Sequence, residues 1–449
     1  MNKQFLINIL RSNSFIIKSS NIIKTLLLTL ILTNPAFGIP QRASILIKDS
    51  PKEVLDQVWQ IVYRDFLDTT GNFDNKKWMS TRKKILSNKY KDSSEGYEAI
   101  RGMLITLKDP YTRFLDPKEF DEMRIDTTGQ LMGVGIQISY DEEKAELIVV
   151  SPIEDSPAYR AGIQPNDIII SIDEEYTDGM GIEDAVKLIR GKKGTKVILG
   201  IIREEKFFKI TLVREKIEIK SVISRVNEAD FGIKIGYIRL KQFNSNAANE
   251  MKSAINKLES QNSTAYVLDL RGNPGGLLES SIEIARQWLN QGIIVSTKTK
   301  NGITDIRRAN GNAITSRPLA ILVNQSSASA SEILSGAIQD NNRGFLVGKK
   351  TFGKGLVQSV RPLVDGSGLT VTVAKYLTPK GKDIDKYGIA PDIEADLKLK
   401  GMKNFTSFDL GTKKDSQYVA AEIALIKRLS NRSSVKYNQN TKNLTYALK

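Results

Sequence analysis

The chain has 449 residues, of which 40% are hydrophobic and 26% are charged, and its formal net charge at pH 7 is +15. It contains neither cysteine nor histidine. This excludes disulfide bonds, thiol nucleophiles, Ser-His-Asp triads and zinc sites built on Cys or His. Hydrolytic chemistry would therefore have to use Ser, Thr, Asp, Glu, Lys or Tyr. The length predicts about two to four domains, and the composition is that of a soluble globular protein.

The positive charge is compatible with a nucleic-acid or anionic-membrane partner. However, Lys3, Arg11, Lys18 and Lys24 lie in the N-terminal segment considered next. The remaining Lys and Arg residues are scattered, without the interleaved aromatic residues of a nucleic-acid platform. We therefore expect no nucleic-acid partner.

Residues 1–38 have the features of an export signal. Basic residues precede the apolar run TLLLTLILT, Thr25 to Thr33, and small residues follow at Ala36 and Gly38, as a signal cleavage site requires. This run is too short to span a bilayer, which takes about 20 residues. We predict a cleaved signal peptide, with an uncleaved N-terminal anchor as the alternative. Both interpretations predict an exported chain.

From Ser50 to about Glu122 the pattern is helical. Pro51 suits a first helical position. It is followed by apolar residues at helical spacing, namely Val54, Leu55, Val58, Trp59 and Val62. The region ends in LKDPYTRFLDPKEF, which is broken by Pro110 and Pro117. We interpret it as a small helical cap without site residues.

From about Thr127 to Val213, short strand-like segments surround a short helix, IEDAVKLIRG. The strand-like segments are GVGIQISYD, AELIVVSPI, DIIISID, KVILGIIRE and FFKITLV. This order resembles a PDZ domain. Gly133 and Gly135 permit a tight loop whose backbone amides point inward as a cradle for an anion, and the strand that follows offers an open edge. We expect a peptide to add to that edge, with its terminal carboxylate held by Gly133, Val134, Gly135 and Ile136. The alternative is that the glycines only form a turn.

From about Glu218 to Asp396, apolar strand-like runs alternate with helices. The strand-like runs are GIKIGYIRL, AYVLDLRG and LAILVNQ, and the helices lie near 247–258, near 277–289 and from about 331. This alternation predicts an α/β core with partly parallel strands. The tail from Leu399, with its helix AAEIALIKRL, carries no visible chemistry.

The segment Leu322 to Asp340 places four serines, Ser326, Ser327, Ser329 and Ser331, between the apolar strand AILVN and a helix. The amides of a first helical turn have no intrahelical partners and can stabilise a developing oxyanion. A nucleophile would benefit from that position. However, Ser329-x-x-Glu332 is also a capping-box pattern, and taken alone the segment favours capping.

Two further motifs change this balance. In FGKGLVQ, Phe352 to Gln358, a buried and neutral Lys354 could act as a general base without histidine, and Gln358 could accept a hydrogen bond from its amine. By itself, a Gly-Lys-Gly turn is typical of an exposed hairpin. In LDLRGNPGG, Leu268 to Gly276, the glycines let a backbone amide approach a substrate, although the spacing is not that of a phosphate-binding loop.

Together the three motifs, in this order after a PDZ-like segment, resemble the C-terminal processing peptidases, also called tail-specific proteases. The resemblance runs from about residue 50 to 395 and includes DPYTRFL and GYIRL. It implies Ser329 as the nucleophile, Lys354 as the general base and Gln358 as the residue that orients it. It also implies an oxyanion hole of the Gly275 and Ala330 amides, with Glu332 as a supporting residue. It implies no metal and no cofactor.

We therefore predict a multidomain α/β protein with a helical N-terminal cap, a PDZ-like β domain and an α/β protease core with a mixed sheet. The predicted parts are a signal peptide (1–38), an N-terminal helical region packed on the core (39–122), the PDZ-like domain (123–217), the core (218–398) and a C-terminal tail (399–449).

The resemblance implies an exported serine endopeptidase that cuts near the free C-terminus of protein or peptide substrates, membrane-associated ones included. General similarity to cyanobacterial and plastid members points to the C-terminal extension of a photosystem II reaction-centre precursor, processed in the thylakoid lumen. The alternatives are a general tail-specific protease of the periplasm and a non-catalytic PDZ adaptor that binds C-termini. The oligomeric state is not predicted.

Overall fold

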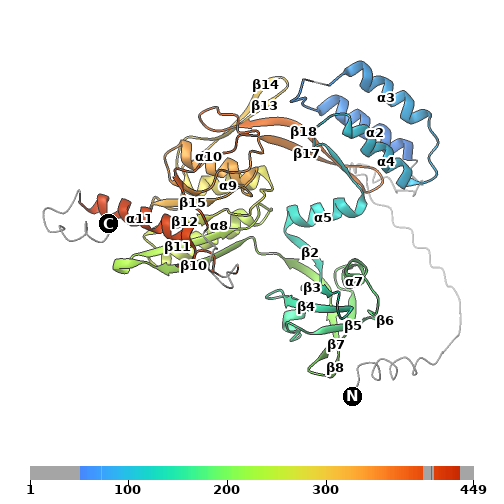
Figure 1. Ribbon diagram of the computed structural model, residues 1–449, viewed down its shortest axis with the longest axis horizontal. Helices are drawn as coiled ribbons and strands as arrows, with labels where there is room; N and C mark the ends of the chain where they lie inside the picture. The colour runs from blue at the N-terminus through green and yellow to red at the C-terminus, as the bar shows by residue number, and fades with distance from the viewer. Residues whose placement is uncertain (1–50, 72, 398–405, 407–408, 435–449) are drawn as a thin grey trace, which may run out of the picture. The chain divides into compact units, whose positions relative to one another are not determined.

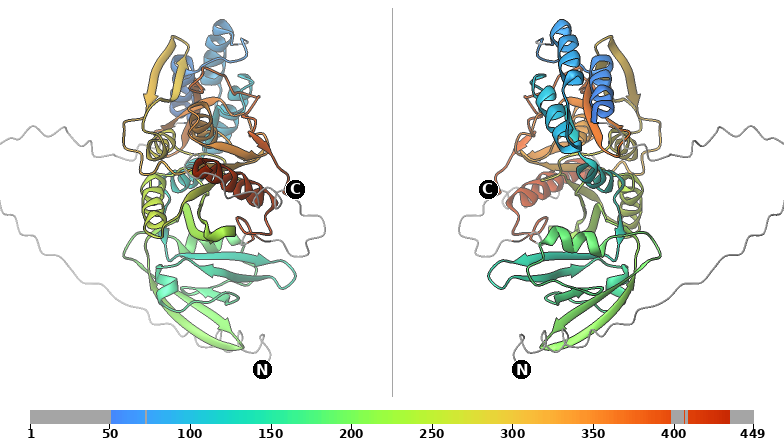
Figure 2. Two further views of the ribbon diagram at one scale, coloured as in Figure 1. Left: turned by 90° about the vertical axis from the view of Figure 1, so that its left-hand side faces the viewer. Right: turned by 90° about the vertical axis from the view of Figure 1, so that its right-hand side faces the viewer.

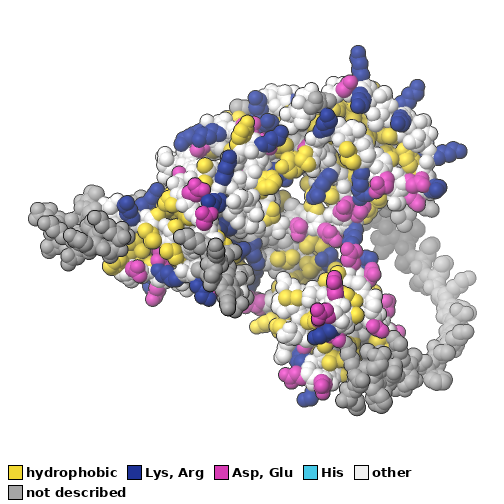
Figure 3. All heavy atoms as spheres, viewed as in Figure 1, with side chains coloured by type: hydrophobic (Ala, Val, Ile, Leu, Met, Phe, Trp, Pro, Cys, Tyr) yellow, Lys and Arg dark blue, Asp and Glu magenta, His cyan; other side chains and the backbone are white. Residues whose placement is uncertain are grey.

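The computed structural model describes residues 51–71, 73–397, 406 and 409–434. The predicted signal peptide lies outside these residues. Within the described part of the chain, no helix is both long and apolar enough to cross a membrane. Lys and Arg side chains are dispersed among Asp and Glu over the face seen in Figure 3.

Three N-terminal helices, α2 (Pro51–Asp65), α3 (Asn75–Ser87) and α4 (Ser93–Ile105), form the predicted cap. All five apolar residues predicted to face the core from the first helix are buried. A short strand, β1 (Arg113–Leu115), then pairs antiparallel with β18 (Gly368–Leu377). Leu369 and Val371 of β18 share a hydrophobic cluster with the helices, so the cap packs directly on a sheet of the core (Figure 1).

The PDZ-like segment forms one antiparallel sheet with the strand order β3-β4-β5-β7-β8, and β6 pairs with β5. Its elements are β3 (Ile136–Asp141), β4 (Glu146–Pro152), α6 (Pro157–Arg160), β5 (Ile168–Ile172), β6 (Glu175–Tyr176), α7 (Ile182–Ile189), β7 (Lys196–Arg203) and β8 (Lys206–Val213). Before it come helix α5 (Pro117–Thr128) and strand β2 (Gln130–Gly133), and β2 pairs with β9 (Glu215–Glu218). Helix α5 and strand β9 run across the boundaries proposed from sequence at 122 and 217.

The core holds a six-stranded sheet with the order β10-β11-β12-β15-β16-β19. Its strands are β10 (Val222–Glu228), β11 (Lys234–Leu240), β12 (Ala265–Asp269), β15 (Leu319–Val323), β16 (Phe345–Gly348) and β19 (Ile393–Glu394). Only the β10–β11 pair is antiparallel among the pairs of this described sheet. The sheet is therefore mixed, as predicted.

Alternate residues of these strands point to opposite faces of the sheet, and each face is covered. One face packs against α8 (Ala247–Ser260), α9 (Leu278–Trp288) and α10 (Ala330–Asp340). The other packs against α11 (Ser416–Ser434), the red helix of Figure 2. A second, antiparallel sheet joins β1 and β18 to β13 (Ile293–Thr299), β14 (Gly302–Arg308) and β17 (Leu356–Pro362).

Candidate active site

Ser329 occupies a strained turn between β15 and α10. Its backbone dihedral angles are φ 54° and ψ −113°, a region that non-glycine residues rarely adopt. Such strain persists only where surrounding contacts hold it, and it is concentrated at functional sites. A serine on a tight strand-to-helix turn is also the arrangement that exposes the nucleophile of α/β-hydrolases.

The structure distinguishes the four serines of this turn. The Ser327 hydroxyl donates to the Leu270 carbonyl (2.8 Å) and is fully buried. The Ser331 hydroxyl donates to the Asn273 carbonyl (2.9 Å) and is also fully buried. Ser326 is exposed to solvent. Of the four, Ser329 is the one on the wall of a cavity of about 620 Å³.

The cavity brings together residues from three distant segments of the chain. Beside Ser329 and Ala330 of the serine turn, its wall contains Lys354 from the loop before β17 and Gln358 from β17 itself. Tyr111 and Arg113, from the end of the N-terminal cap, also line it. Our interpretation of that cap segment as free of site residues is therefore wrong. The motif DPYTRFL is part of the family resemblance, but nothing in the sequence assigns its residues to the site, because only the pairing of β1 with β18 brings them there.

Lys354 is half-buried, and its amine lies 4.8 Å from the centre of the Tyr111 ring. Burial, followed by the positive charge of Arg113, lowers the pKa of Lys354. The carboxylates of Asp109 and Glu332 act in the opposite direction but do not outweigh these effects. Lys354 therefore gives up its proton more readily than an exposed lysine, as a general base must.

The buried carboxylate of Glu332 joins the serine turn to the loop that carries Lys354, residues 351–355, here called the lysine loop. Its Oε2 accepts from the backbone amides of Ser329 (2.9 Å) and Lys354 (2.8 Å). Its Oε1 accepts from the Thr351 hydroxyl (2.6 Å) and the Gly353 amide (2.8 Å). The bond from Ser329 is the one that a capping box requires. Capping alone does not account for the three bonds to the lysine loop.

The two amides implied as an oxyanion hole lie next to each other, but they differ in availability. Ala330 opens α10, and among the described residues its amide has no acceptor. Gly275 has φ 105°, and a Cβ placed on it would lie 2.9 Å from the Ser329 Cβ and 3.0 Å from the Ala330 nitrogen. Its amide donates to the Asn273 Oδ1 (2.9 Å). An oxyanion at Gly275 would thus share that amide with Asn273.

Gln358 and Tyr376 both line the cavity, but they differ in their contacts with the lysine loop. The Gln358 amide nitrogen donates to the Thr372 Oγ1 (3.4 Å), and no hydrogen bond joins Gln358 to Lys354 among the described residues. The buried Tyr376 of β18 lines the cavity, and its hydroxyl donates to the Lys354 carbonyl. Sequence reasoning missed Tyr376 because its position in a strand carries no sign that it faces a site.

The PDZ-like segment presents the predicted open edge, since β3 pairs only with β4 within the described sheet. In the preceding loop, Gly135 has φ 77°, and a Cβ there would lie 2.2 Å from the Ser156 Cβ. The Ser156 hydroxyl donates to the Gly135 carbonyl (3.1 Å). Val134 is buried. The loop is thus tightly fitted at Gly135.

Matches to protein families cover both the core and the PDZ-like segment. Residues 234–395 match the model of peptidase family S41, and residues 148–203 match that of the PDZ domain.

Individual relatives span most of the chain. The chain is 43% identical over 396 residues to a carboxyl-terminal-processing protease of Synechocystis sp., covering 86% of this chain and 91% of the relative. It is 44% identical over 347 residues to the chloroplastic carboxyl-terminal-processing peptidase 2 of Arabidopsis thaliana, covering 75% of this chain and 67% of the relative. A solved photosystem II D1 C-terminal processing protease superposes with a TM-score of 0.51 at 36% identity, covering 78% of this chain and 94% of that one.

Proposed function

Because this chain belongs to the carboxyl-terminal-processing proteases of peptidase family S41, we propose that Ser329 and Lys354 are its catalytic dyad. The protein is a serine peptidase that carries a PDZ domain. One observation carries the assignment of residues. Of the four serines in the turn, Ser329 lies on the wall of the cavity that also contains Lys354, and the pKa of that lysine is lowered.

In the proposed reaction, the Ser329 hydroxyl attacks the carbonyl carbon of the scissile peptide bond while the neutral Lys354 amine takes its proton. The negative charge on the carbonyl oxygen is stabilised by the Ala330 amide, with the Gly275 amide as the second donor. The Lys354 ammonium then protonates the leaving amine. Water, deprotonated by the same amine, hydrolyses the acyl-enzyme and restores the Ser329 hydroxyl.

The proposed substrate is the C-terminal extension of the photosystem II D1 precursor, and the proposed location is the thylakoid lumen. The solved relative is a photosystem II D1 C-terminal processing protease, and the sequence relatives come from a cyanobacterium and a chloroplast; both facts support this choice. The substrate's free C-terminus would add to the edge of β3, with its carboxylate at the loop of Gly133 to Ile136. A general tail-specific protease of the periplasm is the alternative.

The test compares two peptides by mass spectrometry, one carrying the D1 C-terminal extension and one an unrelated apolar C-terminus. The protein should release a single C-terminal fragment from the D1 peptide, with higher kcat/KM than for the unrelated peptide. Ser329→Ala should bind both peptides and cleave neither. Equal kcat/KM for the two would favour the general protease, and binding without cleavage by the unaltered protein would favour a PDZ adaptor.

A further inference from the structure

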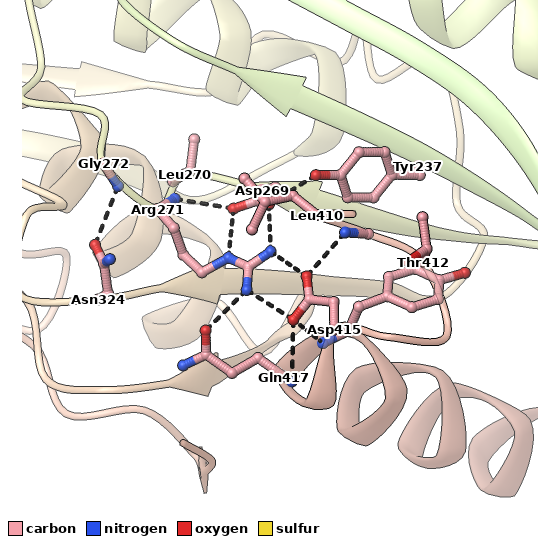
Figure 4. A network of polar contacts seen from close by, with 12 residues as sticks. Tyr237, Asp269, Leu270, Arg271, Gly272, Asn324, Leu410, Thr412, Asp415 and Gln417 are labelled. Atoms are coloured by element: carbon pink, nitrogen blue, oxygen red, sulfur yellow. Dashed lines mark hydrogen bonds and ion pairs between the residues drawn. The ribbon is translucent and has the colours of Figure 1, made fainter. Parts of the chain in front are cut away.

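The Arg271 guanidinium lies between two carboxylates that are far apart in the sequence (Figure 4). One is Asp269, two residues before it, whose Oδ2 accepts from Arg271 Nη2 at 2.6 Å. The other is Asp415, whose Oδ1 and Oδ2 accept from Nη1 (2.9 Å) and Nη2 (2.6 Å). Asp269 and Asp415 are 0% exposed and Arg271 is 5% exposed. The three side chains form a buried, hydrogen-bonded ion cluster.

Asp415 also organises the start of the C-terminal helix α11. Its Oδ1 accepts from the backbone amides of Gln417 (3.1 Å) and Tyr418 (3.2 Å), as an N-cap residue does. Its Oδ2 accepts from the Gly411 amide (2.8 Å). The Gln417 Oε1 is a further acceptor for Arg271 Nη1 (2.8 Å). The first turn of α11 is thereby attached to Arg271, although the sequence of the tail gave no sign of this.

Arg271 begins the loop that packs against the serine turn. The next amide, that of Gly272, donates to the Asn324 Oδ1 (3.1 Å), at the point where β15 leads into that turn. The Asn273 carbonyl accepts from the Ala328 amide (3.1 Å) and the Ser331 hydroxyl (2.9 Å). Gly275 lies so close to the serine turn that a Cβ placed on it would be 2.9 Å from the Ser329 Cβ and 3.0 Å from the Ala330 nitrogen. A shift at Arg271 would therefore be passed to the amides around Ser329.

We propose that Asp415 is a positioning residue for the reaction, acting through Arg271 to hold residues 271–276 against the nucleophile turn. This inference rests on the proposed roles of Ser329 and Gly275. Asp415→Asn leaves Arg271 paired with Asp269, but it replaces one acceptor oxygen with an NH₂ group. Each Asp415 oxygen accepts from one Arg271 nitrogen and from at least one backbone amide, so that NH₂ group would face donors in a buried site. The loop is therefore expected to rearrange when Asp415 is replaced. The start of α11 thus belongs to the catalytic unit and not to a dispensable tail.

The experiment compares Asp415→Asn with Asp409→Asn. Asp409 lies in the same segment, but its carboxylate binds the Lys414 amine (2.8 Å) and the Thr406 amide (2.8 Å) and does not bind Arg271. For each variant, kcat, KM and the affinity for a peptide aldehyde are measured below the thermal midpoint. The aldehyde forms a tetrahedral adduct with a serine, and the adduct's oxygen reports on the oxyanion donors.

Loss of an oxyanion donor outright costs about 100-fold or more in kcat, so a displaced loop should cost at least about tenfold. We expect Asp415→Asn to lower kcat and aldehyde affinity by similar factors, with KM within about twofold, since peptide binding uses the PDZ edge. Asp409→Asn should match the parent. Equal loss of kcat in both variants, or parent-like kcat and aldehyde affinity in Asp415→Asn, would overturn the inference.

If Asp415→Asn does not fold, Gln417→Met takes its place, since it removes one acceptor of Arg271 without changing a charge. It should lower kcat and aldehyde affinity together by a smaller factor, and parent-like values would overturn the inference.

Two controls separate this result from failure of the proposed function. A parent that does not cleave, or a Ser329→Ala that does, contradicts the dyad itself, whereas the positioning role is judged only where the parent is active and Ser329→Ala is inactive.

Discussion

Replacing Glu332 with Gln tests the link between the serine turn and the lysine loop. Two backbone or hydroxyl donors face each oxygen of the carboxylate. An amide keeps only one acceptor oxygen. If its NH₂ group replaces Oε2, it faces the two backbone amides of Ser329 and Lys354. If it replaces Oε1, the Gly353 amide loses its acceptor and the Thr351 hydroxyl can no longer donate to the side chain. A hydrogen bond to a charged group contributes about 1.5–3 kcal/mol, and losing two should lower the free energy of unfolding by about 3–6 kcal/mol.

The assay is thermal unfolding together with steady-state cleavage. For a domain of this size, a loss of 1 kcal/mol in the free energy of unfolding lowers the thermal midpoint by about 2–4 °C. The midpoint of the core should therefore fall by roughly 6–24 °C. Because the Lys354 amide is one of the four donors, kcat should fall as well at temperatures where the variant is folded. The control is Glu283→Gln, which breaks an exposed pair with Arg286 and should cost under about 1 kcal/mol.

The reasoning would be refuted if Glu332→Gln melted within about 2 °C of the parent and kept its kcat. That result would mean that the four bonds to Glu332 do not hold the lysine loop to the serine turn.

Three further predictions concern the base and the peptide cradle. Lys354→Met should be inactive yet melt higher at pH 7, because the folded-state pKa of Lys354 is lowered and its protonation therefore destabilises the fold. Differential scanning calorimetry should show this gain in thermal midpoint shrink as the pH approaches the unfolded-state pKa of about 10.4. A lower midpoint than the parent at pH 7 would contradict burial of a neutral lysine. Arg113→Gln should raise the pKa of Lys354 and move the acid limb of the kcat/KM profile to higher pH, whereas an unmoved limb would remove Arg113 from this role. Gly135→Ala should weaken the binding of peptides with a free C-terminal carboxylate more than that of amidated peptides, because the new Cβ would clash with Ser156. Gly133→Ala is the matched control, since a Cβ at Gly133 meets no atom closer than 3.9 Å. If calorimetric titration showed equal losses of affinity for both peptides, the loop would be only a turn and not a carboxylate site.

The elements that the sequence predicted best are those specified by local periodicity. Helix α2 was expected because its apolar residues recur at helical spacing, and each of them is buried. The serine turn was expected because an apolar strand runs into an amphipathic helix, and the structure places α10 at Ala330–Asp340. Such patterns depend on neighbours within a few turns or strand residues, so a single sequence contains them.

What could not be predicted depends on contacts between distant segments. Arg113 reaches the cavity because β1 pairs with β18, and its hydrogen-bond partner Thr370 lies 257 positions downstream in the sequence. Asp415 reaches Arg271 across 144 positions. Neither partner has a distinctive local pattern. The hydrogen bond from the Gly275 amide to the Asn273 side chain joins residues that are close in sequence. It nevertheless depends on a side-chain rotamer that the sequence does not specify.

The dyad is tested most directly by locating the residue that reacts with a peptidyl fluorophosphonate, using tandem mass spectrometry of the digested protein. The probe phosphonylates an activated serine with loss of fluoride, and the reaction rate depends on the base that removes the serine proton. We predict labelling at Ser329 in the parent, and a large loss of labelling rate in Lys354→Met and Lys354→Arg, since a guanidinium cannot be deprotonated in proteins. Labelling at Ser326, or an unchanged rate at Ser329 in Lys354→Arg, would contradict the account.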